Sequence, residues 1–154
     1  MSRASGPVVV IGCGRLGAYV AGELSRAGRE VVVLDRRAEA FEALPAGFSG
    51  FTVEGDAGEY DALERAGLAK AGSVLACTAN DNVNILAAQV AARVHQVPRV
   101  LARVFDTDRQ ELCDRLGIRT ISPSEVLGVM FVRFLAEPDA SDGSGTSGTS
   151  GGAA

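Results

Sequence analysis

The sequence contains little of the chemistry on which many enzymes and nucleic-acid-binding proteins depend. Lys70 is the only lysine and His95 the only histidine among 154 residues. The formal net charge is −4, the pI is near 5.0, and no dense basic run occurs. Nucleic acids and anionic lipids bind basic surfaces. We therefore expect neither of them to be the main partner.

Cysteine is scarce and the apolar runs are short. Cys13, Cys77 and Cys113 are odd in number and widely spaced, which favours neither a disulfide framework nor a zinc site and fits a reducing cytoplasm. The first seven residues contain no hydrophobic signal region. The longest late apolar run, Val126 to Val132, is cut by Arg133 well short of a bilayer-spanning length. We expect a soluble protein with one core.

The most informative stretch that is present runs from Val8 to Gly17, VVVIGCGRLG. It is typical of a buried strand that turns into a phosphate-binding helix. Gly12 allows the tight turn, Gly14 allows the backbone to approach a pyrophosphate, and Gly17 allows the helix to lie close against the sheet. Phosphate then lies at the helix N-terminus, where backbone N–H groups and the macrodipole favour an anion.

A G-x-G-x-x-G pattern alone is weak evidence, but its surroundings support it here. A second strand, Glu30 to Leu34, ends in Asp35, 18 residues beyond Gly17. A carboxylate at that place accepts hydrogen bonds from the ribose diol of an adenosine. The sequence therefore predicts a nucleotide site rather than an ordinary glycine-rich turn.

The remaining pattern alternates strands and helices, which predicts an α/β fold: a Rossmann-like, doubly wound, parallel six-stranded sheet in the order 3-2-1-4-5-6. Later strands are expected at 51–54, 73–77, 99–104 and 118–121, and helices at 38–44, 59–66, 84–95, 107–116 and 122–137. We predict a flexible N-terminus over 1–7, a nucleotide-binding domain over 8–137, and a disordered tail rich in Gly, Ser and Thr over 138–154.

Ligands of doubly wound sheets bind beyond the carboxyl ends of the strands. The residues expected there are small, hydrogen-bonding or phosphate-pairing, and they include no evident catalyst: Gly12 to Gly17, Asp35, Arg36, Gly55, Asp56, Ala57, Thr78, Asn80, Asn84 and Arg103. His95 falls at the far end of its helix, which favours a surface or packing role. Tyr19 and Tyr60 lack the lysine four residues later that a Tyr/Lys proton relay needs.

Two residues, Cys13 and Arg15, allow two interpretations each. Cys13 is a small apolar filler or a thiol whose pKa is lowered by the helix N-terminus. Arg15, in the first turn of the phosphate-binding helix, is a solvated arginine or the partner of a terminal phosphate that a dinucleotide lacks. Asp81 and Glu125 most simply serve helix N-termini.

These residues resemble the N-terminal nucleotide-binding domain of the Trk and Ktr potassium-uptake regulators, related to the regulator-of-potassium-conductance domains of potassium channels. The resemblance covers about residues 8–134. It rests on Gly-Cys-Gly-Arg-Leu-Gly at 12–17, Val-Leu-Asp at 33–35, Gly-Asp-Ala at 55–57, Leu-Glu-Arg-Ala-Gly-Leu at 63–68, Thr78 with Asp81 and Asn84, Ala-Arg-Val at 102–104, and Leu-Gly-Ile with Ile-Ser-Pro within 116–123.

The resemblance implies a domain that binds NAD(H) or ATP/ADP as a sensor, not as a reagent. The cofactor-binding residues that it implies are Gly12, Cys13, Gly14, Arg15, Leu16, Gly17, Asp35, Arg36, Asp56, Ala57, Thr78, Asn84 and Arg103. It also implies a membrane potassium-conducting subunit as partner, on whose cytoplasmic side the protein assembles. The family's further C-terminal ligand-binding domain has no counterpart in this sequence, as in a shortened chain or a single-domain protein.

The leading hypothesis is a cytoplasmic, nucleotide-sensing regulatory subunit of a potassium transporter or channel, and not an enzyme. The alternative is a small NAD(P)-dependent oxidoreductase or its cofactor domain, which rests on the shared fold alone. A pure assembly module with a vestigial pocket is a third possibility. Asp35 disfavours a 2′-phosphate and so NADP, although Arg36 and Arg37 weaken that argument.

The last predicted helix carries a broad apolar stripe of Val126, Leu127, Met130, Phe131, Phe134 and Leu135 at spacings of three and four. It either folds back on its own sheet or crosses to a neighbouring subunit. The sharper hypothesis is a crossover or dimerisation helix that builds a homodimer or a larger ring.

Overall fold

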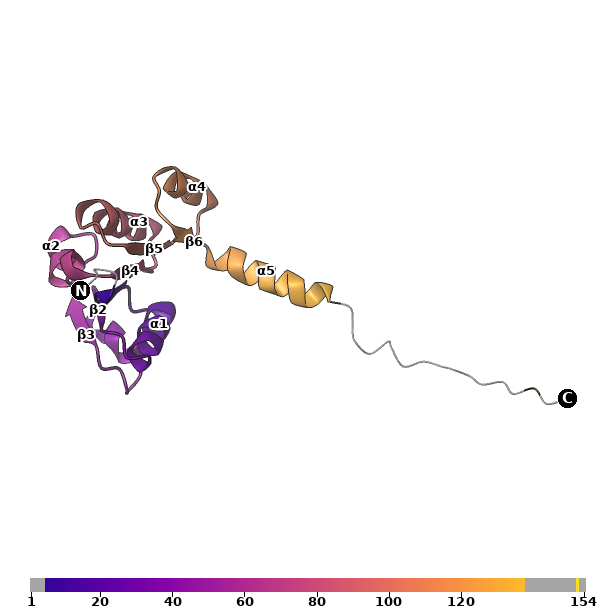
Figure 1. The fold of residues 1–154 in the computed structure, drawn as a ribbon, viewed down its shortest axis with the longest axis horizontal. Helices are drawn as coiled ribbons and strands as arrows, with labels where there is room; N and C mark the ends of the chain where they lie inside the picture. Colours follow the sequence, from indigo (N-terminus) through magenta and orange to yellow (C-terminus); the bar gives the residue numbers. More distant parts are fainter. Residues whose placement is uncertain (1–4, 138–151, 153–154) are drawn as a thin grey trace. The chain divides into compact units, whose positions relative to one another are not determined.

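The computed structural model describes residues 5–137 and residue 152. Within them the chain forms one parallel six-stranded sheet in the order β3-β2-β1-β4-β5-β6 (Figure 1). The strands are β1 (Val8–Ile11), β2 (Val31–Asp35), β3 (Phe51–Glu54), β4 (Ser73–Ala76), β5 (Arg99–Arg103) and β6 (Thr120–Ile121). The predicted Rossmann-like fold and strand order are confirmed.

Helices connect the strands, so every strand runs in the same direction and all carboxyl ends meet at one edge. The α-helices are α1 (Arg15–Arg26), α2 (Tyr60–Arg65), α3 (Asp81–Gln89), α4 (Thr107–Arg115) and α5 (Pro123–Ala136). Two 3-10 helices, η2 (Ala38–Ala43) and η3 (Leu68–Lys70), and a π-helix, η4 (Val90–Val94), complete the described elements.

Strand β1 lies at the centre of the sheet, and all of its residues are buried. Val9 and Ile11 pack into the apolar cluster on one face, whereas Val8 and Val10 pack into the cluster on the other. A strand covered on both faces has no solvent side. This is why its sequence is a continuous apolar run instead of an alternating one.

Two connections differ in helix type from the prediction. The segment expected as a helix over 38–44 is the 3-10 helix η2, because it is short and Leu44 is forced into extended backbone by the following Pro45. The alanine-rich helix reaches His95 as predicted but widens after Gln89 into η4, where the His95 N–H donates to the Val90 carbonyl at 3.1 Å.

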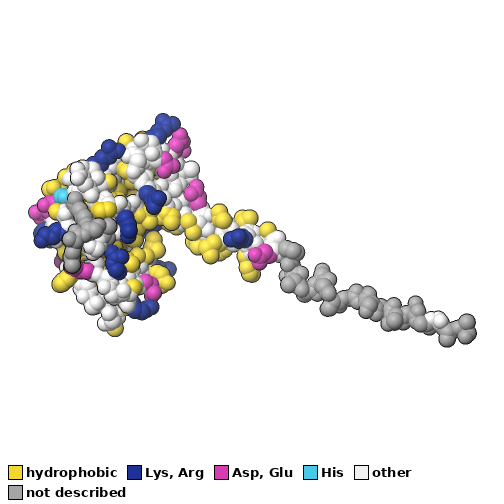
Figure 2. Space-filling model, in the orientation of Figure 1, with side chains coloured by type: hydrophobic (Ala, Val, Ile, Leu, Met, Phe, Trp, Pro, Cys, Tyr) yellow, Lys and Arg dark blue, Asp and Glu magenta, His cyan; other side chains and the backbone are white. Residues whose placement is uncertain are grey.

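Helix α5 forms as predicted, in a second structural unit that begins at Ser124. Its side chains are almost all apolar, interrupted by charges such as Arg133 (Figure 2). No helix among the described residues has the length and apolar character needed to cross a membrane. The predicted flexible N-terminus lies mostly outside the described residues, as does the predicted tail apart from Gly152. The domain boundaries stay predictions.

Candidate nucleotide-binding site

A cavity of about 680 Å³ lies at the carboxyl edge of the sheet. Turns that follow neighbouring strands supply its lining: Gly12, Gly14, Arg15, Leu16, Leu34, Asp35, Arg36, Arg37, Gly55, Asp56, Ala57, Cys77, Thr78, Ala79, Asn80, Val83 and Arg103. The structure thus brings every predicted binding residue to this lining except Cys13, Gly17 and Asn84.

The glycine turn after β1 leaves no room for side chains at two positions. Gly12 has a φ of +101°, and a Cβ added there would lie 2.8 Å from the Thr78 nitrogen of the neighbouring turn. A Cβ at Gly17 would lie 1.9 Å from the Gly12 carbonyl oxygen, so Gly17 packs against the turn itself. Gly14, the N-cap of α1, is open: a Cβ there would meet nothing within 4 Å. Its open side belongs to the cavity lining.

Asp35, at the end of β2, joins the glycine turn to the turn after its own strand. Its Oδ2 accepts a hydrogen bond from the Cys13 N–H at 2.8 Å, and its Oδ1 accepts one from the Arg37 N–H at 2.9 Å. Each carboxylate oxygen keeps a further lone pair. The Asp35 carboxylate is therefore held in place and can still accept from a ligand hydroxyl.

Cys13 is not a reactive thiol. Its side chain is buried, and burial, followed by the nearby Asp35 carboxylate, raises its pKa. The interpretation as a thiol with a lowered pKa is wrong, because burial and then the Asp35 carboxylate raise the pKa instead. Cys13 fills space beneath the turn, and its backbone N–H orients Asp35.

Asn84 is fully buried and lies behind the cavity wall. Its Oδ1 accepts from the Thr78 N–H at 2.8 Å and the Thr78 hydroxyl at 2.7 Å, while its Nδ2 donates to the carbonyls of Thr78 and Arg103, both at 2.9 Å. The expectation that Asn84 lines the pocket is wrong, because its amide is committed to protein partners. It ties the end of β4 to the end of β5.

Arg103, the last residue of β5, also reaches toward Thr78. Its Nη2 donates to the Thr78 carbonyl at 2.8 Å, and its guanidinium lies 4.8 Å from the centre of the Phe105 ring. Its Nε is buried and has no hydrogen-bond partner among the described residues. The guanidinium is thus held in orientation, but not all of its N–H groups have hydrogen-bond partners. It retains donors for an anionic ligand.

Asp81 lies in the first turn of α3, where its charge favours the helix N-terminus as expected, and it also contacts a distant turn. Its Oδ2 accepts from the backbone N–H groups of Phe105 at 3.0 Å and Asp106 at 3.1 Å, so it fixes the turn after β5. The N-cap of α3 is Asn80, whose Oδ1 accepts from the Asn82 and Val83 N–H groups. The contacts of Asp81 with the turn after β5 were not predicted, because they link residues more than twenty positions apart.

The charge of the lining favours an anion. Four arginines face the cavity, Arg15, Arg36, Arg37 and Arg103, against two aspartates, Asp35 and Asp56. Asp56 uses Oδ1 to accept from the Gly58 N–H at 2.8 Å, which closes the turn after β3. A positive excess in a chain of net charge −4 concentrates the attraction for phosphate groups in this cavity.

The prediction missed some of the lining. Leu34 and Arg37 flank the predicted pair of Asp35 and Arg36, and Cys77 and Ala79 flank Thr78, so proximity in sequence to a named residue was the available signal. Val83, one turn into α3, carries no local signal.

Burial raises the pKa of Cys77 to about 11, an effect that Cys13 and Asp35 reinforce and Arg103 opposes.

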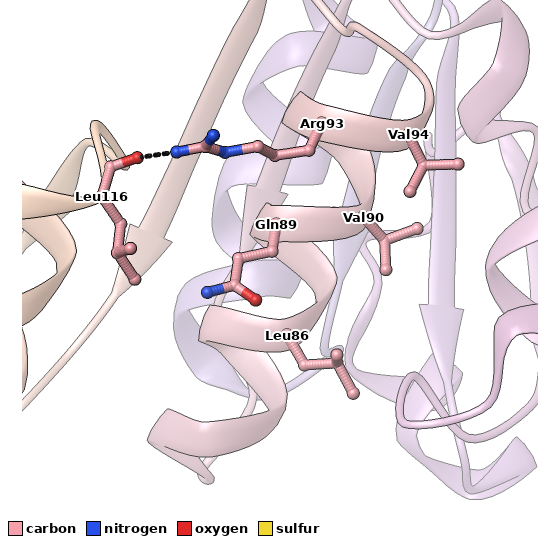
Figure 3. A pocket seen from close by; sticks show the side chains of 6 residues that line it. All are labelled: Leu86, Gln89, Val90, Arg93, Val94 and Leu116. Carbon is pink, nitrogen blue, oxygen red and sulfur yellow. Dashed lines mark hydrogen bonds between the residues drawn. The ribbon is translucent and has the colours of Figure 1, made fainter.

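A second hollow, of about 390 Å³, lies on the outer side of α3 and η4 (Figure 3). It is lined by Leu86, Gln89, Val90, Arg93, Val94 and Leu116, and Arg93 donates to the Leu116 carbonyl. Its lining is mainly aliphatic and holds no glycine turn or carboxylate. The nucleotide-binding features thus belong to the larger cavity.

Comparison with known proteins identifies relatives of this chain. A curated relative, the Trk system potassium uptake protein TrkA of Streptomyces coelicolor, is 40% identical over 115 residues, which are 75% of this chain and 52% of the relative. The chain therefore spans about half the length of that relative.

Solved structures share the fold. The TrkA-N domain of the inner membrane protein ybaL from Escherichia coli matches with a TM-score of 0.75 at 16% identity, covering 84% of this chain and 96% of that one. GsuK bound to ADP matches with a TM-score of 0.71 at 23% identity, covering 88% and 35%. The GsuK channel bound to NAD matches with a TM-score of 0.71 at 24% identity, covering 84% and 23%. The TrkA-N family model matches residues 8–123, and this chain belongs to the TrkA-N domain family.

Proposed function

We propose that this chain is the nucleotide-sensing domain of a cytoplasmic regulatory subunit that controls a potassium transporter or channel. The observation that carries the proposal is the cavity itself, which combines an open glycine turn, an oriented carboxylate and an excess of arginine. The relative in Streptomyces coelicolor is a potassium uptake protein, and GsuK binds ADP and NAD, which supports the proposal.

In this proposal the ligand is NAD(H) or ATP/ADP. Its phosphates lie over Gly14 at the N-terminus of α1, where backbone N–H groups face an anion. Asp35 accepts from the ribose hydroxyls, Arg36 and the Asp56–Ala57 turn border the adenine, and Arg15 and Arg103 pair with phosphate oxygens. Four residues act indirectly, by holding the backbone of the site in place: Gly12, Cys13, Gly17 and Asn84.

We propose that the domain senses its ligand without transforming it. The described cavity lining contains no histidine, lysine or tyrosine, the residue types from which a dehydrogenase commonly takes its proton. The alternative, a small NAD(P)-dependent oxidoreductase, predicts a change in NADH absorbance that depends on an added substrate. If such a change were observed, an oxidoreductase would replace the sensor in this part of the proposal.

The partner in this proposal is a membrane potassium-conducting subunit, which places the protein at the inner face of the membrane. Copies of the chain assemble as a homodimer or a larger ring through α5. A single helix with apolar side chains on so much of its surface cannot cover them itself. The ligand then acts by changing the geometry of the assembly.

Isothermal titration of the purified chain with ATP, ADP, NAD and NADH tests the binding part. We expect saturable binding of at least one nucleotide, and a loss of about tenfold or more in affinity for every adenosine ligand in Asp35→Ala, because hydrogen bonds to a carboxylate are lost. Asp114→Ala, on the exposed side of α4, is the matched control and should bind normally. A wild type whose melting temperature no adenine nucleotide raises would indicate an assembly module with a vestigial pocket.

A further inference from the structure

The only histidine of the sequence joins two helices at a distance from the cavity. The His95 Nε2 atom lies 2.9 Å from Oε1 of Glu64 in α2 and 3.4 Å from the Tyr60 hydroxyl. The imidazole stacks on the Tyr60 ring, with centroids 5.8 Å apart and planes 13° from parallel. The His95 side chain is only 9% exposed. In Figure 2 it is the cyan group, beside acidic side chains.

Unusual backbone holds His95 in this position. It caps the π-helix η4, a wide turn that is rare in proteins and concentrates at functional sites. The next residue, Gln96, has a φ of +53°, the only positive φ of a non-glycine residue in the described chain. Such conformations persist when the surroundings impose them and cluster at functional positions. The placement of His95 against α2 is therefore built into the fold.

Helix α2 connects this contact to the nucleotide cavity. It begins at Tyr60, directly after the turn that contains Gly55, Asp56 and Ala57, all of which line the cavity. Ala57 and the α2 residues Ala62 and Leu63 belong to one buried cluster. A change in the position of α2 thus passes to the turn beside the ligand.

The contact is also suited to respond to pH. Imidazole is the side-chain group that ordinarily changes charge between about pH 5 and 8. The titratable groups of α2 that face His95 are Tyr60, whose pKa is raised by burial and then by Glu64, and Glu64 itself. Asp61 and Arg65 of α2 pair with each other.

The Arg93 guanidinium and the cysteine thiols do not change charge in that pH range. On the helix of His95, Arg93 donates to the Leu116 carbonyl. Burial raises the pKa of all three cysteines above their ordinary value of 9.0. The thiols therefore stay protonated across the pH range in which imidazole titrates.

We propose that the His95–Glu64 pair is a proton-responsive contact that sets the position of α2 and thereby tunes the affinity of the nucleotide cavity. The inference rests on the proposed function. A proton added at the imidazole converts a hydrogen bond to Glu64 into an ion pair of lower free energy. Acidification then fixes α2 and the Gly55–Ala57 turn in the geometry that lines the cavity, and preorganisation favours binding.

The first test is the affinity for NAD at about pH 6 and about pH 8, because the pyrophosphate of NAD carries no group that titrates between them. We expect wild type to bind NAD about threefold more tightly at the lower pH, the size expected of a half-buried ion pair. Glu64→Gln keeps an oxygen that accepts from His95 but removes the charge, so its affinity should be the same at both pH values. Tyr60→Phe keeps the stack and the charge and should retain the response.

The second test needs no nucleotide. The difference in melting temperature between wild type and Glu64→Gln should grow as the pH falls from about 8 to about 6, with Glu111→Gln on α4 as the exposed-pair control. Equal pH profiles of NAD affinity in wild type and Glu64→Gln overturn the coupling. If the melting temperatures of wild type and Glu64→Gln change equally with pH, the contact does not respond to protons. If wild type binds no nucleotide at either pH, the proposed function and the coupling fail together, while the melting temperatures still decide whether the contact responds to protons.

Discussion

At the residue scale, we predict that Arg15 discriminates between the two kinds of proposed ligand. It is the first residue of α1 and lines the cavity beside the open Gly14. A guanidinium there reaches a terminal phosphate that NAD lacks. We predict that Arg15→Ala loses about tenfold in ATP affinity and far less in NAD affinity, measured by calorimetry. An equal loss for both ligands would show that Arg15 does not contact a terminal phosphate.

Cys77 should make the stability of the fold depend on alkaline pH. Burial raises its pKa from 9.0 to about 11, so the folded state keeps a proton that the unfolded state loses between those values. This contribution is complete below about pH 9 and is lost as the pH rises toward 11, by up to about 2 kcal/mol. Thermal melts between these pH values should fall less steeply for Cys77→Ala than for wild type. Parallel curves would contradict the assignment.

Sequence reasoning succeeded where one residue type answers one steric or chemical demand. The glycines at 12 and 17 lie where the pattern indicated, because the tight turn and the close packing leave no room for a side chain, and the carboxylate at 35 lies at the cavity as predicted. It failed for Asn84, and it did not foresee that Asp81, besides its place at the start of α3, fixes the turn after β5. Their partners are backbone groups of other strands, and a polar residue at a helix start looks the same whether it caps that helix or ties distant turns together.

At the scale of elements, strand order and most boundaries followed from the alternating pattern, whereas helix type did not. Apolar spacing does not distinguish the 3-10 helix η2 from one α-helical turn. The π-helix η4 was also unpredicted, since the sequence from Val90 to Val94 suits an α-helix equally well. In the structure η2 lies against α1 and β2, and η4 lies against β5, and these are contacts that the local sequence does not reveal.

Helix α5 carries the prediction about assembly. Phe131 and Phe134 lie on its apolar stripe, and burial of each is worth roughly 1.5–3 kcal/mol. Light scattering should show a dimer or larger ring for wild type, and a monomer or an aggregating species for Phe131→Asp/Phe134→Asp. Glu125→Gln, which changes charge without removing apolar surface, is the control. A wild type that remains monomeric at high concentration, with α5 docked on its own sheet, would overturn the prediction.

For the whole molecule, regulation of potassium movement is the decisive measurement. Potassium uptake by cells with and without this protein should differ, and the difference should change with the level of the nucleotide that binds in vitro. Cells that carry the Asp35→Ala variant should lose the nucleotide dependence. Equal uptake in all conditions would exclude a regulatory role in potassium transport.

The open position of Gly14 predicts how a variant at this residue would behave in cells that also make the wild type. Because its backbone is extended at a φ of −77° and its Cβ position is empty, Gly14→Val should fold normally while its side chain blocks the approach of phosphate. The result would be a protomer that does not bind nucleotide but can still assemble with other copies. Expressed beside the wild type, it would enter the same assemblies, so the allele should be dominant, whereas Gly17→Val, whose Cβ collides with the Gly12 carbonyl, should be recessive.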